Sequence, residues 1–235
     1  VGRQLSDIYP EKFPPEKKSP LALEVKDLSY LPGPTGRPLL RNLSLSLQKG
    51  EILGVGGLLG AGRSELLLAL FGALQAEKTS GEVKVFGKEM EVDSPDEAIA
   101  NGVGLVTEDR KLTGAFLNLS LSENILLPNL KAYTNWGFLN EDQEDKEAMQ
   151  QVDDLRIRCF GPSQLISTLS GGNQQKALLA RWLARKVKIL LLDEPTRGID
   201  VGAKSEIYQL LQGLSEKGLS ILLVSSEMPE LIGVC

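Results

Sequence analysis

A glycine-rich loop supplies the first residues of this chain whose types and spacing could do chemistry. Residues 57–64 read G-L-L-G-A-G-R-S and fit the phosphate-binding pattern G-x-x-x-x-G-K-[ST], except that arginine stands in the lysine position. Such glycines let successive backbone N–H groups turn toward one point, and a following helix adds its positive N-terminal end. A plain glycine turn between a strand and a helix is the alternative. The spacing favours a phosphate site built from Gly57, Gly60, Ala61, Gly62, Arg63 and Ser64, with the Ser64 hydroxyl on Mg²⁺.

Arg63 is the one residue of this loop that departs from the pattern. A lysine at this position reaches the β- and γ-phosphates as a compact charge, whereas a guanidinium is planar, longer and fork-shaped. Two interpretations stay open. Either Arg63 lies at the phosphates, so that nucleotide binding survives while hydrolysis suffers, or its side chain points to solvent.

Two adjacent carboxylates form the second chemical feature. Asp193 and Glu194 directly follow the apolar run Ile189 to Leu192, and open parallel sheets bind ligands at the carboxyl ends of their strands. A solvated turn is the weaker interpretation of two carboxylates after four apolar residues. Asp193 is therefore predicted to hold Mg²⁺, usually through water, and Glu194 to orient or deprotonate an attacking water.

A third feature is the string L-S-G-G-N-Q-Q-K at residues 169–176. The Ser170 hydroxyl and the amides of Gly171 and Gly172 open a predicted helix, whose N-terminus attracts anions. This second phosphate-seeking site is separate from the glycine-rich loop.

The elements that must position these residues alternate between strands and helices. Two antiparallel strands, 23–28 and 43–47, are predicted to join across the turn Pro32-Gly33-Pro34. Near-continuous apolar strands that alternate with helices then imply a parallel sheet covered on both faces. The predicted strands are 51–56, 83–86, 103–107, 188–192 and 220–224, and the helices are 64–71, one that begins at Ser94-Pro95, 172–185 and 203–214. Residues 118–164 are predicted to be a helical insertion, and the proline-containing residues 1–20 a linker.

Composition limits the class of protein. The chain has 235 residues, 42% of them apolar, which is enough for one large domain with a core. A net charge of −5 with interspersed signs offers no basic stripe, so nucleic acid is not an expected partner. No apolar run approaches the ~20 residues of a membrane span. Cys159 and Cys235 have no metal-ligand spacing, and the absence of histidine excludes catalysis by that residue.

Three strings together resemble one protein family. They are Glu108-Asp109-Arg110-Lys111 before Gly114, the string at 169–176, and residues 193–204. From about Leu21 to Cys235 the chain resembles the second, C-terminal ATP-binding cassette of bacterial simple-sugar ABC importers of the ribose and galactoside type. The resemblance implies an α/β P-loop NTPase cassette with a mixed or parallel core sheet, an antiparallel N-terminal β region and a helical subdomain. It also implies that residues 1–20 link to a preceding cassette and that the C-terminus is truncated.

The resemblance further implies ATP and Mg²⁺ as cofactors and several partners. Ser170, Gly171 and Gly172 would complete the ATP site of a sister cassette, either in the same longer polypeptide or in a dimer mate, and Asp200 would lie in the loop that crosses to it. The other implied partners are membrane permease subunits and, indirectly, a periplasmic or extracellular sugar-binding protein. The chain would be peripheral, at the cytoplasmic face of the membrane.

Three departures from a standard cassette surround one expected phosphate. Arg63 replaces the lysine, Glu108 stands where a glutamine usually senses Mg²⁺ and the permease, and Ser225-Ser226-Glu227 stands where a switch histidine is usual. Neutral drift at each position is the alternative. Together they predict a degenerate ATP site with weak or absent turnover, although Glu194 argues against complete inactivity. A regulatory nucleotide-binding module and a soluble ABC ATPase outside transport are the other hypotheses.

Several residues carry weaker expectations. Tyr30 is a candidate for stacking on adenine, although packing is the commoner role of a strand tyrosine. Aromatic residues of the insertion are candidates for contact with a permease, with core packing as the simpler alternative; they are Tyr133, Trp136 and Phe138. A basic cluster is interpreted as a solvated helix end, and its members are Arg181, Arg185, Lys186 and Lys188.

Overall fold

The structure is a computed structural model that describes residues 9–12, 19–32, 39–58, 60–75, 78–129, 134–135, 138–139 and 141–235, with the backbone alone described at 134–135, 138–139 and 141–143. Part of the predicted turn after Pro32 lies outside the described residues, as do Leu59, Tyr133 and Trp136. The side chain of Phe138 also lies outside them. The expected permease contacts of the aromatic residues therefore stay predictions.

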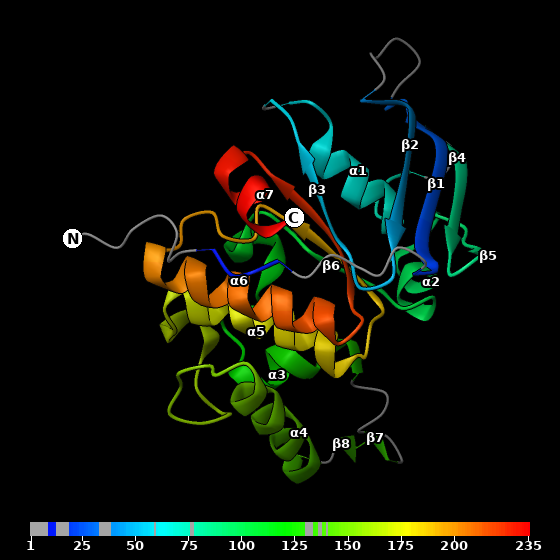
Figure 1. The fold of residues 1–235 in the computed structure, drawn as a ribbon. Coiled ribbons are helices and arrows are strands. Elements are labelled where there is room, and N and C mark those ends of the chain that lie inside the picture. The colour runs from blue at the N-terminus through cyan, green and yellow to red at the C-terminus, as the bar shows by residue number, and fades with distance from the viewer. Residues whose placement is uncertain are drawn as a thin grey trace.

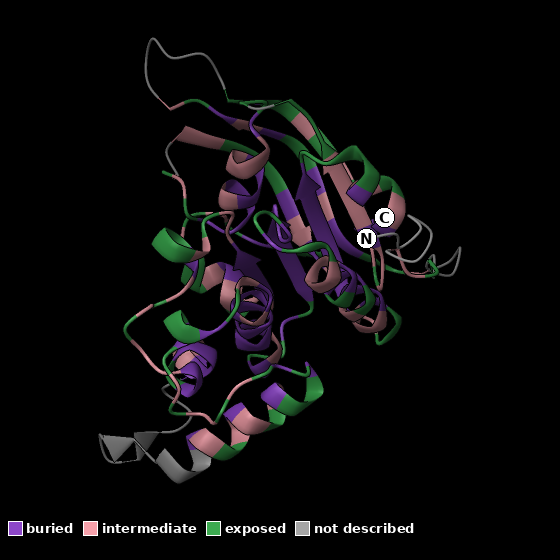
Figure 2. Cartoon of the chain, turned by 90° about the vertical axis from the view of Figure 1, so that its left-hand side faces the viewer, coloured by how far each residue is buried: buried purple, intermediate pink, exposed green. Residues whose placement is uncertain are grey.

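A four-stranded parallel sheet forms the centre of the molecule, as predicted (Figure 1). Its order is β3 (Ile52–Gly56), β10 (Ser220–Ser225), β9 (Ile189–Asp193) and β6 (Val103–Val106). All residues of β9 and β10 are buried (Figure 2), because both faces of these apolar strands are covered. Val224 pairs with Asp193 and Ser225 with Gly56, so the carboxyl ends of these strands meet at one edge of the sheet.

A second sheet is antiparallel and confirms the predicted N-terminal β region. Its order is β2 (Leu40–Gln48), β1 (Leu21–Tyr30), β4 (Thr79–Val85) and β5 (Lys88–Glu89). One face carries the alternating apolar residues of β1, such as Leu23, Val25 and Leu28, into the core. The predicted strand 83–86 belongs to this sheet, as β4, and not to the parallel one.

Helices cover the parallel sheet. The helices α1 (Arg63–Leu70), α5 (Gly171–Ala184) and α6 (Val201–Glu216) agree with the predicted helices to within two residues at either end. Helices α5 and α6 lie side by side (Figure 1). Helix α2 (Pro95–Ala100) begins as predicted, because the Ser94 side chain accepts a hydrogen bond from the Glu97 amide and proline occupies the first turn. A last helix, α7 (Met228–Val234), was not predicted.

The predicted helical insertion contains α3 (Leu121–Leu126) and α4 (Glu141–Asp154), which contact α5. Ser120 and Glu123 form a capping box at the start of α3, and this hydrogen bonding lowers the pKa of Glu123. The insertion also contains a short hairpin, β7 (Thr134–Asn135) and β8 (Phe138–Leu139), which a purely helical prediction missed. None of the helices in the described part of the chain combines the length and apolar content needed to cross a bilayer.

Candidate functional site

The glycine-rich loop connects β3 to α1 at the carboxyl edge of the parallel sheet. Gly60 and Gly62 have φ angles of 78° and 82°, and a Cβ at Gly62 would lie 2.3 Å from the carbonyl oxygen of Leu39. Position 62 therefore requires glycine. Gly62 is the N-cap of α1, and no described side chain caps that helix. The first amides of α1 are thus available to an anion.

Asp193 ends β9 next to this loop. It is 6% exposed and lies beside the side chain of Ser64, the second residue of α1. Burial is the largest cause that raises the pKa of Asp193, and among the described residues its Oδ1 has no hydrogen-bond partner. A buried carboxylate oxygen without a partner beside a hydroxyl group suits a hard cation such as Mg²⁺, which takes oxygen ligands. Ser64 and Asp193, predicted as metal ligands, are therefore brought together.

Arg63 lies against Glu194. Its Nη1 is 3.1 Å from Glu194 Oε1, and the two side chains are only 10% and 8% exposed. The Arg63 Nη1 makes no hydrogen bond of good geometry, so the contact is an ion pair whose N–H groups are not aligned with the carboxylate. The interpretation that Arg63 points to solvent is therefore wrong. The arginine that replaces the expected lysine neutralises the carboxylate expected to act on water.

Besides the contact with Arg63, two hydrogen bonds hold Glu194 in place. Its amide donates to Val224 of β10 at 2.9 Å, and its φ of 46° is a left-handed conformation that is unfavourable for glutamate. The Ser226 hydroxyl donates to Glu194 Oε2 at 3.1 Å. The segment that stands in place of a switch histidine thus contacts Glu194 directly. This contact could not be foreseen from the sequence, because it depends on the register between β9 and β10.

Glu108 lies two residues after the end of β6. It forms an ion pair with Arg197, three residues after Glu194, and its side chain is 36% exposed. No hydrogen bond or ion pair between the described residues joins Glu108 to Ser64 or Asp193. Its predicted role as a metal contact stays a prediction.

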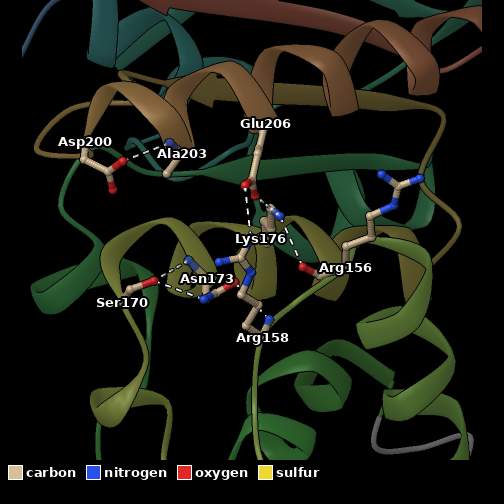
Figure 3. Close-up of polar contacts among 8 residues, drawn as sticks. All are labelled: Arg156, Arg158, Ser170, Asn173, Lys176, Asp200, Ala203 and Glu206. Atoms are coloured by element: carbon tan, nitrogen blue, oxygen red, sulfur yellow. Dashed lines mark hydrogen bonds and ion pairs between the residues drawn. The ribbon is translucent and has the colours of Figure 1, made fainter. Parts of the chain in front are cut away.

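The string at 169–176 begins α5, as predicted. Ser170 is its N-cap, and the Ser170 hydroxyl accepts from Asn173 Nδ2 at 3.0 Å (Figure 3). A Cβ at Gly171 would lie 3.4 Å from the flexible end of Arg110 and 3.8 Å from the Gly198 carbonyl oxygen, whereas a Cβ at Gly172 would lie 2.7 Å from Ala203 Cβ on α6. Gly172 therefore allows α5 and α6 to approach closely, a role that its place in the string did not reveal.

Asp200 also begins a helix. Its Oδ1 accepts a hydrogen bond from the Ala203 amide at 3.0 Å, so Asp200 is the N-cap of α6 (Figure 3). Asp200 is exposed, and Ser170 is exposed at the start of the neighbouring helix. Ser170 and Asp200, both predicted to lie at the junction with a sister cassette, are thus exposed at the starts of neighbouring helices.

An ion pair between the buried Lys176 and the half-exposed Glu206 joins α5 to α6 behind these helix starts. Lys176 Nζ donates to Glu206 Oε2 at 2.7 Å and to the Arg156 carbonyl at 3.2 Å (Figure 3). The hydrogen bond from Lys176 lowers the pKa of Glu206. Asn173 Oδ1 accepts from the Arg158 amide at 3.0 Å, which fixes the chain before the string. The sequence carried no signal for this pairing, since Glu206 lies thirty positions away.

Arg181 is buried, so the interpretation of the basic cluster as a solvated helix end is wrong for this residue. It is 8% exposed and donates to the carbonyls of Asn124 at 2.8 Å and Gly114 at 2.7 Å. Burial lowers its pKa to about 10. Gly114 ends a π-helical turn, Arg110–Gly114, that follows Glu108 and was not predicted. Arg181 therefore ties the segment after Glu108 to α3 and α5, while Arg185, Lys186 and Lys188 are exposed.

Tyr30 and the two cysteines are simpler cases. Tyr30 is 8% exposed and belongs to the core, so the packing role of this strand residue is the one observed. Cys159 and Cys235 are free. Burial raises the pKa of Cys235 to about 12.

Comparison with known proteins agrees with this geometry. A family model described as ABC transporter matches residues 40–197. The galactose/methyl galactoside import ATP-binding protein MglA of Clostridium perfringens is 46% identical over 236 residues, and the ribose import ATP-binding protein RbsA of Halalkalibacterium halodurans is 44% identical over 236 residues. Each match covers 100% of this chain but only 44% and 45% of the relative, so the chain spans less than half their length.

Solved structures share the fold. A nucleotide-free ATP-binding cassette from an ABC transporter has a TM-score of 0.78 at 20% identity, over 91% of this chain and 85% of that one. A dimeric cassette in a post-hydrolysis state with ADP and phosphate has a TM-score of 0.72 at 24% identity, over 88% of both chains. The architecture is therefore that of an ATP-binding cassette. Because the family model covers most of the described domain, the chain belongs to the ABC transporter family.

Proposed function

We propose that this chain is an ATP-binding cassette of a bacterial importer of a simple sugar, of the ribose or galactose type. The residues that would hold the phosphates are Gly57, Gly60, Ala61, Gly62, Arg63 and Ser64. Support comes from the loop that precedes α1, whose first amides no described side chain caps, and from relatives whose names specify ribose or galactose import. Which sugar is carried is a property of partners outside this chain.

Ser64 and Asp193 are the residues that would hold Mg²⁺. A hard cation suits this pair of oxygen ligands, the Ser64 hydroxyl and the Asp193 carboxylate. The buried Oδ1 of Asp193 has no hydrogen-bond partner among the described residues, so it is available to a cation. A bound Mg²⁺ supplies charge neutralisation at the phosphates. Glu108 is a further candidate, which would first have to leave its ion pair with Arg197.

The chain's own ATP site is proposed to bind nucleotide and to hydrolyse it slowly or not at all. The observation that carries this proposal is the 3.1 Å contact between Arg63 and Glu194. A general base must be free to accept a proton from water, and the contact with Arg63 occupies one carboxylate oxygen of Glu194. Ser226 also occupies one carboxylate oxygen of Glu194.

The second half of the proposal concerns a neighbouring cassette. Ser170, Gly171 and Gly172 would close the ATP site of a sister cassette, and Asp200 would lie at the same junction. Both helix starts carry an exposed capping residue, and a related cassette fold has been solved as a dimer. The sister cassette would belong to the same longer polypeptide or to a dimer mate, with residues 1–20 as the link to a preceding cassette.

The remaining partners follow from this assignment. Permease subunits would bind the helical region that contains α3 and α4, and a periplasmic or extracellular sugar-binding protein would act indirectly. The chain would then work as a peripheral subunit at the cytoplasmic face of the membrane.

Binding and turnover measurements test the proposal. A fluorescent ATP analogue with Mg²⁺ should bind the chain, and Ser64→Ala should weaken binding. ATP hydrolysis should be slow. Hydrolysis as fast as in a two-cassette protein, and lost in Glu194→Gln, would contradict the degenerate site.

A regulatory nucleotide-sensing module is the second candidate, because the Arg63–Glu194 pair also suits a site that binds without turnover. Ser170→Ala in the full-length polypeptide separates the two functions, with the exposed Ser167→Ala as the matched control. Loss of sugar transport in Ser170→Ala alone supports donation to a sister site. Unchanged ATPase activity and transport would favour the regulatory module.

A further inference from the structure

Residues 9–12, called here the N-terminal strap, lie against the last two helices of the chain. The ring of Tyr9 stacks on that of Tyr208 of α6, with centroids 5.4 Å apart and planes 21° from parallel. Lys12 Nζ donates to the carbonyl oxygens of Ile232 and Cys235 at the end of α7. A cation at this position satisfies terminal carbonyls and opposes the helix dipole. The strap is thus docked at both of its ends.

Gly233 of α7 makes room for the strap. A Cβ at this position would lie 2.2 Å from Cδ1 and 2.4 Å from Cγ of Tyr9. Such a contact is impossible without displacement of the ring. The fit between Tyr9 and Gly233 is therefore specific to glycine, although a helix interior ordinarily disfavours that residue.

Hydrogen bonds connect the stacked ring of Tyr208 to two buried residues, Thr196 and Glu230. The hydroxyl of Tyr208 lies 3.4 Å from Thr196 Oγ1, and Thr196 donates its proton to Glu230 Oε1 of α7 at 2.7 Å. Each of these three residues is only 1% exposed. The hydroxyl of Tyr208 is therefore the donor toward Thr196, since the Thr196 proton is already used. Among the described residues Glu230 Oε2 has no hydrogen-bond partner, so the Thr196 bond is important to this buried carboxyl group.

Thr196 belongs to the turn that follows Glu194. The Arg197 amide donates to the Glu194 carbonyl at 3.0 Å, and the Ile199 amide donates to the Thr196 carbonyl at 3.2 Å. Glu194 itself has the unfavourable φ of 46°. A residue keeps such a conformation only when its surroundings hold it. The buried Thr196 side chain is anchored to α6 and α7 two residues away from that strained backbone.

We propose that Thr196, Tyr208 and Glu230 are positioning residues for Glu194, and that the N-terminal strap stabilises them by clamping α7 and Tyr208. The inference rests on the proposed function in one respect, namely that Glu194 faces a bound nucleotide. The strap gives the polypeptide before Tyr9 a direct physical connection to that carboxylate. Displacement of the strap loosens the turn 194–199, and a firmly docked strap fixes it.

Amide hydrogen exchange of the chain, measured by NMR so that each amide is seen separately, tests the inference. Gly233→Ala and Tyr9→Ala should speed exchange at Arg197 and Ile199 about 5-fold or more, the size of a typical coupling between sites. Amides of β9, such as Leu191, should keep their protection. Gly213→Ala is the matched control, because no atom lies within 4 Å of a Cβ placed there. Tyr9→Phe keeps the stacked ring and should behave as the unaltered chain.

A second pair of variants examines the hydrogen bond itself. Thr196→Val keeps the shape but removes the donor, and should speed exchange in the turn; Thr196→Ser keeps the hydroxyl and should restore protection. Affinity for MgATP and the rate of a single turnover should change in Thr196→Val and recover in Thr196→Ser.

The inference is overturned if Gly233→Ala and Tyr9→Ala leave exchange of the turn unchanged. It is also overturned if exchange quickens while affinity and rate both stay constant. A chain that binds no MgATP would contradict the proposed function, while the exchange pattern would still decide whether the strap holds the turn.

Discussion

Arg63 Nη1 and Glu194 Oε1 lie 3.1 Å apart, so the first residue of α1 and the residue after β9 neutralise each other at the carboxyl edge of the parallel sheet. The pair links the glycine-rich loop, which holds Arg63, to the carboxylate after β9, although a phosphoryl-transfer site needs the two groups to act separately. A positive group is needed at the phosphates, and a free carboxylate at the water. In this chain the two groups contact each other.

Arg63→Lys should therefore raise ATP turnover. A lysine is a compact charge that reaches the phosphates, and it would leave Glu194 free to act as a base. Because general-base catalysis contributes ~10²–10⁴-fold, we expect a gain of at least about 10-fold in kcat, measured by phosphate release. The exposed Arg185→Lys serves as control. A gain that persists after Glu194→Gln is added would contradict this explanation.

Asp193→Asn should change the pH dependence of stability. Burial raises the pKa of Asp193 above 3.8, so the folded chain holds this proton more tightly than the unfolded chain. The contribution of Asp193 to stability is therefore present at low pH and is lost as pH rises through the raised pKa. An uncharged amide at this position would carry no such penalty. The Asp193→Asn variant should therefore have the higher Tm at neutral pH, while its nucleotide binding should no longer depend on Mg²⁺.

Thermal unfolding from pH 3 to 8 checks this expectation. Asp153→Asn on the exposed face of α4 provides the comparison. If the two substitutions give the same pH profile, burial of Asp193 does not govern it.

Gly172→Ala should lower the free energy of unfolding, whereas Gly171→Ala should leave it nearly unchanged. The added Cβ at position 172 would meet Ala203 Cβ at 2.7 Å, and overpacking of this kind costs about 1–3 kcal/mol in the free energy of unfolding. Position 171 has room and is the first residue of α5, so alanine there should change stability by less than about 0.5 kcal/mol. Urea unfolding measures both. Equal losses in the two variants would mean that the contact with α6 is not what requires glycine at 172.

Arg181→Met should destabilise the chain by about 2–4 kcal/mol. It removes three hydrogen bonds, to the Gly114 carbonyl and to the backbone and side-chain oxygens of Asn124. Asn124 Oδ1 keeps its hydrogen bond from the Phe116 amide, and each carbonyl left without a partner costs ~1–3 kcal/mol before neighbours adjust. Arg185→Met, at the exposed end of the same helix, should change stability by less than about 0.5 kcal/mol. Urea unfolding again gives the comparison, and similar values for both arginines would contradict a structural role of the buried one.

The sequence predicted the elements whose patterns are local. The apolar runs of β9 and β10, the N-caps Ser94 and Ser170 and the glycine-rich turn before α1 each carry their signal within a few residues. The pairing of Ser64 with Asp193 could also be expected, because motif spacing and the rule for parallel sheets place both at one edge.

The contacts that sequence reasoning missed depend on pairing over long separations. Arg181 looked like part of a solvated basic cluster, because nothing near it in sequence shows that the carbonyls of Gly114 and Asn124 face it. Helix α7 is short and has Pro229 in its first turn, so its apolar pattern was too brief to identify. The direction of the Arg63 side chain could not be decided either, since it depends on Glu194 in three dimensions.

The close approach of α5 and α6 at Gly172 and Ala203 has a consequence for evolution. The two positions share one small volume, so a larger side chain at one can be accepted only with a smaller one at the other or with a shift of both helices. Because Ser170 and Asp200 begin those same helices, such a shift would also displace both helix starts. Selection on the surface that carries Ser170 and Asp200 therefore also restricts residue size at two interior positions, and we expect positions 172 and 203 to covary among related cassettes.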